Sequence, residues 1–147
     1  MKAAVLEARG REGLKLRDFP RPVPAEGEAV LRVHAAGLNR VDLYMRDSGA
    51  GITHSLPQVM GVDGAGVIEA VDPDETRLAV GQRVALHPGI ACGRCEFCLR
   101  GDDVLCTRMK LLGEHRDGTW AEWVSLPARN VFPAPDGLDD AEVAALG

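Results

Sequence analysis

The chain has 147 residues, of which 46% are hydrophobic and 27% are charged, and its formal net charge is −5 at pH 7. This size and composition are typical of one soluble globular domain with a core of its own. The modest, unclustered charge argues against nucleic acid as a partner, and no apolar run is long enough to span a membrane. A small molecule is therefore the expected ligand.

Turn-forming residues predict a mainly β architecture. The 17 glycines and 9 prolines favour many turns between short strands over a helical bundle. We expect the first strands at residues 1–7, 14–19 and 28–36. His34 falls on the more solvent-exposed face of the third strand. We interpret it as an ordinary strand residue because a lone histidine lacks the partners that a metal site needs.

Residues 37–46, Gly-Leu-Asn-Arg-Val-Asp-Leu-Tyr-Met-Arg, are predicted to leave that strand and begin a short helix. Asn39 suits the N-cap position, and Asp42 follows three residues later, so the pair can satisfy free helix N–H groups. This capping role requires no function. Residues at a helix start beside a strand end are nevertheless well placed to line a cleft.

Glycines 61, 64 and 66 follow the order G-x-x-G-x-G, whereas dinucleotide-binding loops have G-x-G-x-x-G. The apolar run after them is typical of a strand, so a phosphate would meet no helix N-terminus. We therefore assign these glycines to close backbone packing at a strand bend. A further strand is expected over residues 81–87.

The four cysteines of the chain lie in one short stretch with the spacing C-x2-C-x2-C-x7-C: Cys92, Cys95, Cys98 and Cys106. Four thiolates in a closed tetrahedral set suit zinc and leave no coordination position for a substrate. The spacing therefore predicts a structural zinc site in a lobe at about residues 89–110. Such a site carries roughly two negative charges, and four nearby cations are candidates to compensate them, namely Arg94, Arg100, Arg108 and Lys110.

Three alternatives to zinc are disfavoured. Two disulfides would need an oxidising compartment, and the N-terminus has no apolar run that resembles a signal peptide. An iron–sulfur cluster is disfavoured because the fourth cysteine lacks the short spacing and the following proline of the ferredoxin pattern. Four unrelated buried thiols would serve no packing purpose that valine or alanine would not serve better.

The last elements are a strand and a helix. Asp117-Gly118 predicts a turn, and residues 119–126 are expected to form a strand whose Trp120 and Trp123 point to opposite faces. Only one of these tryptophans can then face the core. Asp139 and Glu142 are spaced as a capping box at the start of a helix.

These motifs, in this order, resemble the N-terminal catalytic domain of the medium-chain dehydrogenase/reductases, the superfamily of zinc-type alcohol dehydrogenases and quinone oxidoreductases. The resemblance rests on the cysteine stretch and on residues 37–42, 61–67 and 117–123. It implies a mainly β fold with short helices, a GroES-like, partly open β-barrel over residues 1–147 that carries the zinc lobe. It also implies a following nucleotide-binding domain that binds NADPH or NADH, so we expect no cofactor-binding residue in this chain.

The resemblance also implies where a catalytic zinc would lie, and here the sequence departs from the family. The cysteine, histidine and neighbouring glutamate ligands of the alcohol dehydrogenases match Asn39, Val62 and Asp63. Valine supplies no ligand atom, and one carboxylate cannot hold a catalytic zinc alone. Asp42 matches an aspartate that supports the zinc-bound histidine in those relatives.

The pattern formed by Asn39, Asp42, Tyr44 and Arg46 instead resembles the quinone oxidoreductase branch, which works without catalytic zinc. We expect the complete protein to use NAD(P)H to reduce a quinone or a conjugated carbonyl, and this chain alone to be inactive. Asn39 and Tyr44 would hold the substrate oxygen, with Asp42 and Arg46 as orienting partners and Asp63 as a further site residue. A homo-oligomer in the cytoplasm is expected.

Two alternative functions stay open at this point. One is a zinc-type alcohol dehydrogenase with atypical ligands. The other is a binding module without enzymatic activity, because the GroES-like fold is shared with co-chaperonins.

Overall fold

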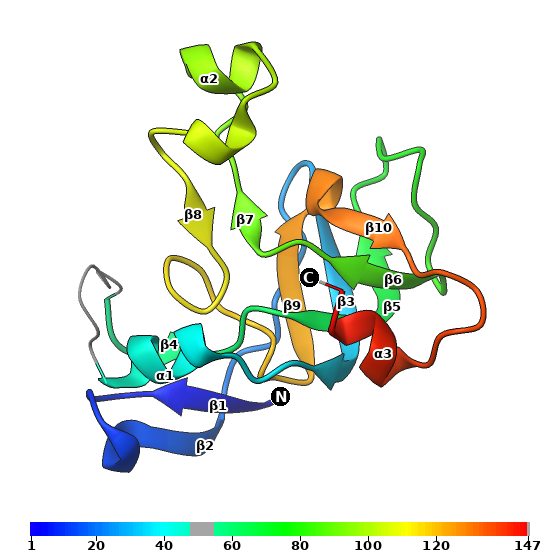
Figure 1. The fold of residues 1–147 in the computed structure, drawn as a ribbon. Helices are drawn as coiled ribbons and strands as arrows, with labels where there is room; N and C mark the ends of the chain where they lie inside the picture. Colours follow the sequence, from blue (N-terminus) through cyan, green and yellow to red (C-terminus); the bar gives the residue numbers. More distant parts are fainter. Residues whose placement is uncertain (48–54, 147) are drawn as a thin grey trace.

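Short antiparallel strands form three sheets in the computed structural model, which describes residues 1–47 and 55–146 (Figure 1). The first sheet has the order β2-β1-β4 and is built from β1 (Lys2–Leu6), β2 (Leu14–Asp18) and β4 (Gln58–Val59). A pair of two-residue strands, β7 (Gly89–Ile90) and β8 (Lys110–Leu111), leads into the cysteine stretch.

The largest sheet has five strands in the order β10-β6-β5-β3-β9. Its members are β3 (Glu28–Ala36), β5 (Gly64–Val71), β6 (Arg83–Leu86), β9 (Trp123–Pro127) and β10 (Val131–Pro133). The outer strands β9 and β10 are not paired with each other, so the sheet curves without closing. The main core packs on it through fully buried side chains such as Leu31, Ile68 and Leu126. The predicted mainly β, partly open barrel is confirmed.

The helices are short: α1 (Arg40–Asp47), α2 (Glu96–Leu99) and α3 (Asp140–Ala144), with 3-10 turns at Arg11–Gly13, Asp103–Leu105 and Ala128–Asn130. The predicted capping box of α3 is confirmed, because the Asp139 carboxylate accepts from the Glu142 N–H at 2.8 Å and the reciprocal bond is 2.9 Å long. Among the described residues, none of these helices has the length and apolar character needed to cross a membrane.

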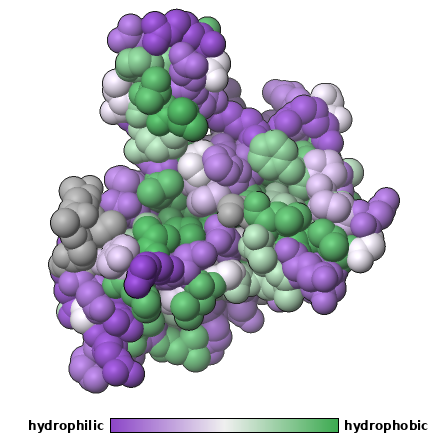
Figure 2. All heavy atoms as spheres, in the orientation of Figure 1, coloured by the Kyte–Doolittle hydropathy of each residue, from purple (hydrophilic) through white to green (hydrophobic). Residues whose placement is uncertain are grey.

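The segment between β7 and β8 projects from the rest of the chain as a lobe that carries α2 (Figure 1). Hydrophilic residues cover the tip of this lobe in Figure 2. With little hydrophobic core of its own, the lobe depends on other interactions for its structure.

The predicted strand at 119–126 begins later than expected, at Trp123. Residues 118–120 instead pair with residues 59–61 through bonds such as Trp120 N–H to the Met60 carbonyl at 2.9 Å. The two tryptophans do lie in different environments. Trp120 packs against a second core cluster, whereas Trp123 lies beneath the Arg21 guanidinium, which is 4.3 Å from its ring centre.

Gly66 lets β3 and β5 approach each other where their register shifts, between Val33 and Ala35. A Cβ atom at Gly66 would lie 2.0 Å from the Arg32 carbonyl oxygen, a distance that no side chain can tolerate. The expected role of this glycine in close backbone packing is confirmed.

We predict that Gly66→Ala destabilises the fold by about 1–3 kcal/mol, because the central strand pair must separate to admit the methyl group. Gly81→Ala is the matched control. A Cβ there meets nothing within 4 Å, and only the φ of +85° opposes it, so the loss should be nearer 1 kcal/mol. Urea unfolding of both variants measures this difference, and equal losses would contradict the close-packing argument.

Candidate functional site

Asn39 and Asp63 form the centre of the candidate site. The Asn39 side-chain amide donates to Asp63 Oδ2 at 2.5 Å, which joins the loop after β3 to the residue before β5. Backbone contacts hold the two segments in place, because Gly37 N–H donates to the Asp63 carbonyl at 3.2 Å and the Trp120 indole donates to the Gly37 carbonyl at 2.9 Å. Asn39 is half-buried, so a ligand can still reach it.

Asp42 lies directly behind this pair and is only 1% exposed. Its Oδ2 accepts from the Asn39 backbone N–H at 2.7 Å, which is one half of the expected capping arrangement. The Asn39 side chain does not supply the other half, because it is turned to Asp63. Oδ1 of Asp42 has no hydrogen-bond partner among the described residues.

The environment of Asp42 favours its neutral form. Burial raises the pKa of Asp42 above its ordinary value, and the negative charge of Asp63 acts in the same direction, against the opposing effect of the Asn39 N–H. A buried carboxyl oxygen without a partner is costly when charged, so a proton on this group stabilises the site.

A catalytic zinc does not fit at residues 39, 62 and 63. Val62 is 6% exposed and packs with Leu6, Met45 and Met60 in the second core cluster. The Val62 side chain offers no ligand atom, so only the Asn39 amide oxygen and the Asp63 carboxylate remain, fewer than the three protein ligands of a catalytic zinc site. Within residues 1–47 and 55–146, the four cysteines are the only group of three or more metal-binding side chains close enough to share an ion.

Tyr44 and Arg46 lie apart from this cluster. Successive residues of a helix are rotated by about 100°, so Tyr44 points away from Asp42, and Tyr44 is 50% exposed. Arg46 forms a two-pronged ion pair with its neighbour Asp47 at 2.7 and 2.6 Å. The structure thus brings together three of the five predicted catalytic residues, and roles for Tyr44 and Arg46 stay predictions.

The four cysteines form a compact cluster in the lobe. All four Sγ atoms lie within 4.8 Å of one another, and none of the four cysteines is joined in a disulfide, an arrangement that favours one shared metal ion over two bridges. The Cys95–Cys98 and Cys92–Cys98 sulfur distances are 3.4 and 3.9 Å. A tetrahedral zinc site with bonds of about 2.3 Å requires sulfur atoms about 3.8 Å apart. The cysteines therefore fit a structural zinc ion, which would order the lobe.

Hydrogen-bond donors surround the sulfur atoms. The N–H groups of Cys92 and Arg108 donate to Cys106 Sγ at 3.2 and 3.4 Å, and the Arg108 guanidinium donates to Cys92 Sγ at 3.4 Å. The Arg94 backbone N–H lowers the pKa of Cys92 to about 6, whereas burial and the Cys95 sulfur raise the pKa of Cys98 to about 12. A divalent cation bound to the four sulfur atoms would displace their remaining protons.

Arg100 does not compensate this charge. Its guanidinium lies over the Phe97 ring, 5.1 Å from the ring centre, and 3.6 Å from Asp102. Of the four cations that the sequence offered for this role, Arg108 is the one in direct contact with a cysteine sulfur.

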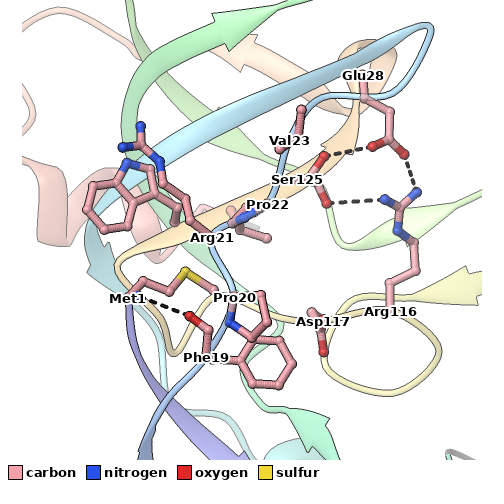
Figure 3. Close-up of a pocket in the computed structure, with 12 residues that line it drawn as sticks. Met1, Phe19, Pro20, Arg21, Pro22, Val23, Glu28, Arg116, Asp117 and Ser125 are labelled. Carbon is pink, nitrogen blue, oxygen red and sulfur yellow. Dashed lines mark hydrogen bonds and ion pairs between the residues drawn. The ribbon is translucent and has the colours of Figure 1, made fainter.

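A cavity of about 420 Å³ lies elsewhere, between the proline-rich segment 19–23 and β9 (Figure 3). Its charged groups already have partners. Glu28 binds Arg116 at 2.6 Å and accepts from the Ser125 hydroxyl at 2.7 Å, and Asp117 accepts from the Val59 N–H at 3.2 Å. We therefore do not place the substrate there.

Sequence reasoning missed Gly37 and Thr119 as parts of the site. The Thr119 hydroxyl donates to the Asp63 carbonyl at 2.7 Å, and Gly37 packs tightly against Asp63, since a Cβ at Gly37 would lie 3.1 Å from the Asp63 Cβ. Both fall in stretches that carried the family resemblance, but neither residue type by itself signals a site.

Comparison with known proteins now defines the class. The alcohol dehydrogenase GroES-like domain model matches residues 25–136. The chain belongs to this family, and thereby to the medium-chain dehydrogenase/reductases, as the resemblance implied.

Individual relatives agree with this assignment. An alcohol dehydrogenase of Geobacillus stearothermophilus is 36% identical over 99% of this chain and 43% of its own length. The crystal structure of an NAD-dependent alcohol dehydrogenase is 46% identical, with a TM-score of 0.94 over 99% of this chain and 43% of that one. A cobalt- and zinc-bound thermostable alcohol dehydrogenase from Pyrobaculum aerophilum is 32% identical, with a TM-score of 0.89 over 99% and 44%. The chain spans less than half the length of these relatives.

We predict that the purified chain contains one zinc ion, which elemental analysis measures. Replacing one ligand, as in Cys98→Ser, should reduce the zinc content and loosen the lobe, whereas Arg100→Gln on the same lobe should change neither. Visible absorbance with stoichiometric iron would contradict the zinc assignment. Two zinc ions per chain would contradict the conclusion that residues 39, 62 and 63 hold none.

We predict a pH-dependent effect of Asp42→Asn on stability. The folded-state pKa of Asp42 is raised, so its stabilising contribution is complete below the unfolded pKa of about 3.9 and is lost as pH rises through the folded pKa. The asparagine side chain of this variant keeps the acceptor for the Asn39 N–H but cannot ionise. The variant should therefore gain stability relative to the parent as pH rises above about 4.

The control for this experiment is Asp47→Asn. The ion pair with Arg46 lowers the pKa of Asp47, so its contribution is present above the unfolded pKa and is lost as pH falls. The two variants should thus deviate from the parent in opposite directions in urea unfolding across the pH series. Parallel curves for Asp42→Asn and the parent would show that folding does not raise the pKa of Asp42.

Proposed function

We propose that the chain is the substrate-binding part of an NAD(P)H-dependent oxidoreductase that reduces quinones or conjugated carbonyls without a catalytic zinc. One observation carries this proposal. At the three positions where alcohol dehydrogenases of the family hold the metal, this chain has an amide hydrogen-bonded to a carboxylate, beside a valine packed in the core.

The chemistry of the substrate decides whether a metal is needed. Hydride addition to a simple ketone places a full negative charge on one oxygen, where a Lewis acid contributes several kcal/mol. Addition to a conjugated enone or quinone spreads the charge over an enolate. Oriented hydrogen-bond donors are then adequate to stabilise the oxygen.

Asn39 is positioned to supply such a donor. Its amide carries two N–H groups, and the bond to Asp63 Oδ2 engages one of them. That bond fixes the plane of the amide and leaves the second N–H for the substrate oxygen. Asp63 and Asp42 are then positioning residues, since each acts on Asn39 through a hydrogen bond.

The other parts of the proposal depend on residues outside this cluster. The Tyr44 hydroxyl is exposed on α1 and would serve as a second donor to a substrate lying over that face. The nicotinamide cofactor would be bound by a nucleotide-binding domain beyond this chain, and the complete enzyme would assemble as a homo-oligomer. Zinc held by the four cysteines would order the lobe and take no part in the reaction.

A zinc-dependent alcohol dehydrogenase is the second candidate. It is favoured by the relatives, several of which are alcohol dehydrogenases, one with cobalt and zinc bound. The lack of three metal-ligand side chains at residues 39, 62 and 63 argues against a zinc-dependent reaction. Metal dependence separates the two candidates.

We predict that the complete enzyme reduces conjugated carbonyls or quinones at a rate insensitive to chelators. Asn39→Ala should lower kcat by about 10²–10³, because it removes a donor to the developing oxyanion. Leu38→Ala, at an adjacent position that is 73% exposed, is the control and should keep the parent rate. Steady-state kinetics on both variants measures the difference.

The melting temperature of the same variants shows whether a lower kcat reflects loss of stability instead of loss of the donor. Loss of the Asn39–Asp63 bond should cost about 1 kcal/mol of stability, too little to unfold the chain. An unchanged kcat in Asn39→Ala would contradict the proposed catalytic role of Asn39. Chelator-sensitive oxidation of simple alcohols by the parent would favour the second candidate.

A further inference from the structure

Five cationic side chains line one cavity of about 350 Å³ beside the cysteine lobe, and no acidic residue lines it. The cations are Arg94, Arg108, Lys110, Arg116 and Arg129, and the other lining residues are Ile90, Ala91 and Cys92. This concentration of positive charge contrasts with the net charge of −5 for the whole chain. None of the residues of the candidate substrate site, Asn39, Asp42 and Asp63, lines this cavity.

The cavity lies at the joint between the lobe and the body of the domain. Arg129, in the 3-10 turn after β9, donates to the Ala91 carbonyl just before the first cysteine. Its guanidinium lies so close to Gly93 that a Cβ there would be 2.6 Å from Arg129 Nη1. Arg116 also belongs to the body, whereas the other three cations belong to the lobe, so the cavity has walls from both parts.

Two of the cations are partly compensated by known contacts. Arg116 is paired with Glu28 at 2.6 Å, as Figure 3 shows, and Arg108 donates to Cys92 Sγ at 3.4 Å. If zinc occupies the four thiolates, that group adds roughly two negative charges beside the cavity. Glu28 and the zinc site together balance fewer charges than the five cations supply, so the cavity keeps a net positive charge.

The side chains of Arg94 and Lys110 have no ion pair or hydrogen bond in the part of the chain that the structure describes. They face a space shared with three further cations, an arrangement that is repulsive unless an anion lies between them. Guanidinium groups bind phosphate oxygens in pairs, and an ammonium group adds a point charge from another direction. The volume is sufficient for a phosphate group with an attached substituent.

We propose that this cavity binds a phosphate group, either as inorganic phosphate or as the phosphate of a monoester, and that the bound anion ties the cysteine lobe to the body of the domain. The anion would accept hydrogen bonds from Arg94 and Lys110 on the lobe and from Arg129 on the body. It would thereby remove the repulsion across the joint and stabilise the attachment of the lobe.

Calorimetric titration of the zinc-loaded full chain tests this proposal, with inorganic phosphate and phenyl phosphate as probes at an ionic strength held constant with chloride. We expect saturable binding of one anion per chain and a higher melting temperature in its presence. Arg94→Gln combined with Lys110→Gln should weaken binding by ~10-fold or more, since each removes a charged donor. Arg100→Gln, which changes a lobe arginine outside the cavity, is the matched control and should bind as the parent does.

The two probes distinguish the source of the phosphate. Tighter binding of phenyl phosphate assigns the cavity to a monoester, and tighter binding of inorganic phosphate assigns it to the free ion. Zinc content is measured on each variant, and if the double variant loses zinc, Lys110→Gln alone replaces it. Absence of saturable binding, equal weakening by Arg100→Gln, or acetate binding as tight as phosphate would each overturn the proposal.

Discussion

The backbone contact between residues 59–61 and 118–120 positions the candidate site. Gly118 N–H donates to the Val59 carbonyl at 2.9 Å, and Thr119 N–H donates to the Gly61 carbonyl at 3.0 Å. The contact requires glycine, because a Cβ at Gly118 would lie 2.1 Å from the Gly61 carbonyl oxygen. This contact places the Thr119 hydroxyl where it donates to the Asp63 backbone carbonyl. The position of Asp63 is therefore fixed through its backbone and not through its carboxylate.

At residues 39, 62 and 63, which the family resemblance matches to metal ligands, polar and aliphatic side chains affect the stability of the site. Val62 joins the core cluster of Leu6, Met45 and Met60, so a position that could be polar now contributes to packing. Asp42 stays fully buried with one oxygen unpartnered among the described residues. A buried carboxyl oxygen without a partner costs free energy, and the proposed role of the Asn39–Asp42–Asp63 cluster in substrate binding would account for that cost.

The cysteine lobe and the barrel are stabilised by different interactions. The barrel has a buried apolar core, whereas the lobe has four sulfur atoms, the backbone donors around them, and cations at its base. Arg129 connects the two parts, because it hydrogen-bonds to the lobe while its own backbone lies in the 3-10 turn after β9. The hydrogen bond of Arg129 to the Ala91 carbonyl therefore contributes to holding the lobe on the barrel.

Features that depend on short spacing could be predicted from the residues alone. The cysteine cluster and the capping box at Asp139 each lie within one short stretch, and alternating apolar residues predicted the strand at 28–36 because a strand with one buried face has a period of two. Contacts between distant segments could not be predicted in this way. Three features depend on contacts between segments that are distant in sequence. They are the late start of β9 at Trp123, the hydrogen bond of Asn39 to Asp63, and the five cations around one cavity. The physical reason is that side-chain direction and long-range pairing follow from packing of the whole chain, to which each local residue pattern contributes only a part.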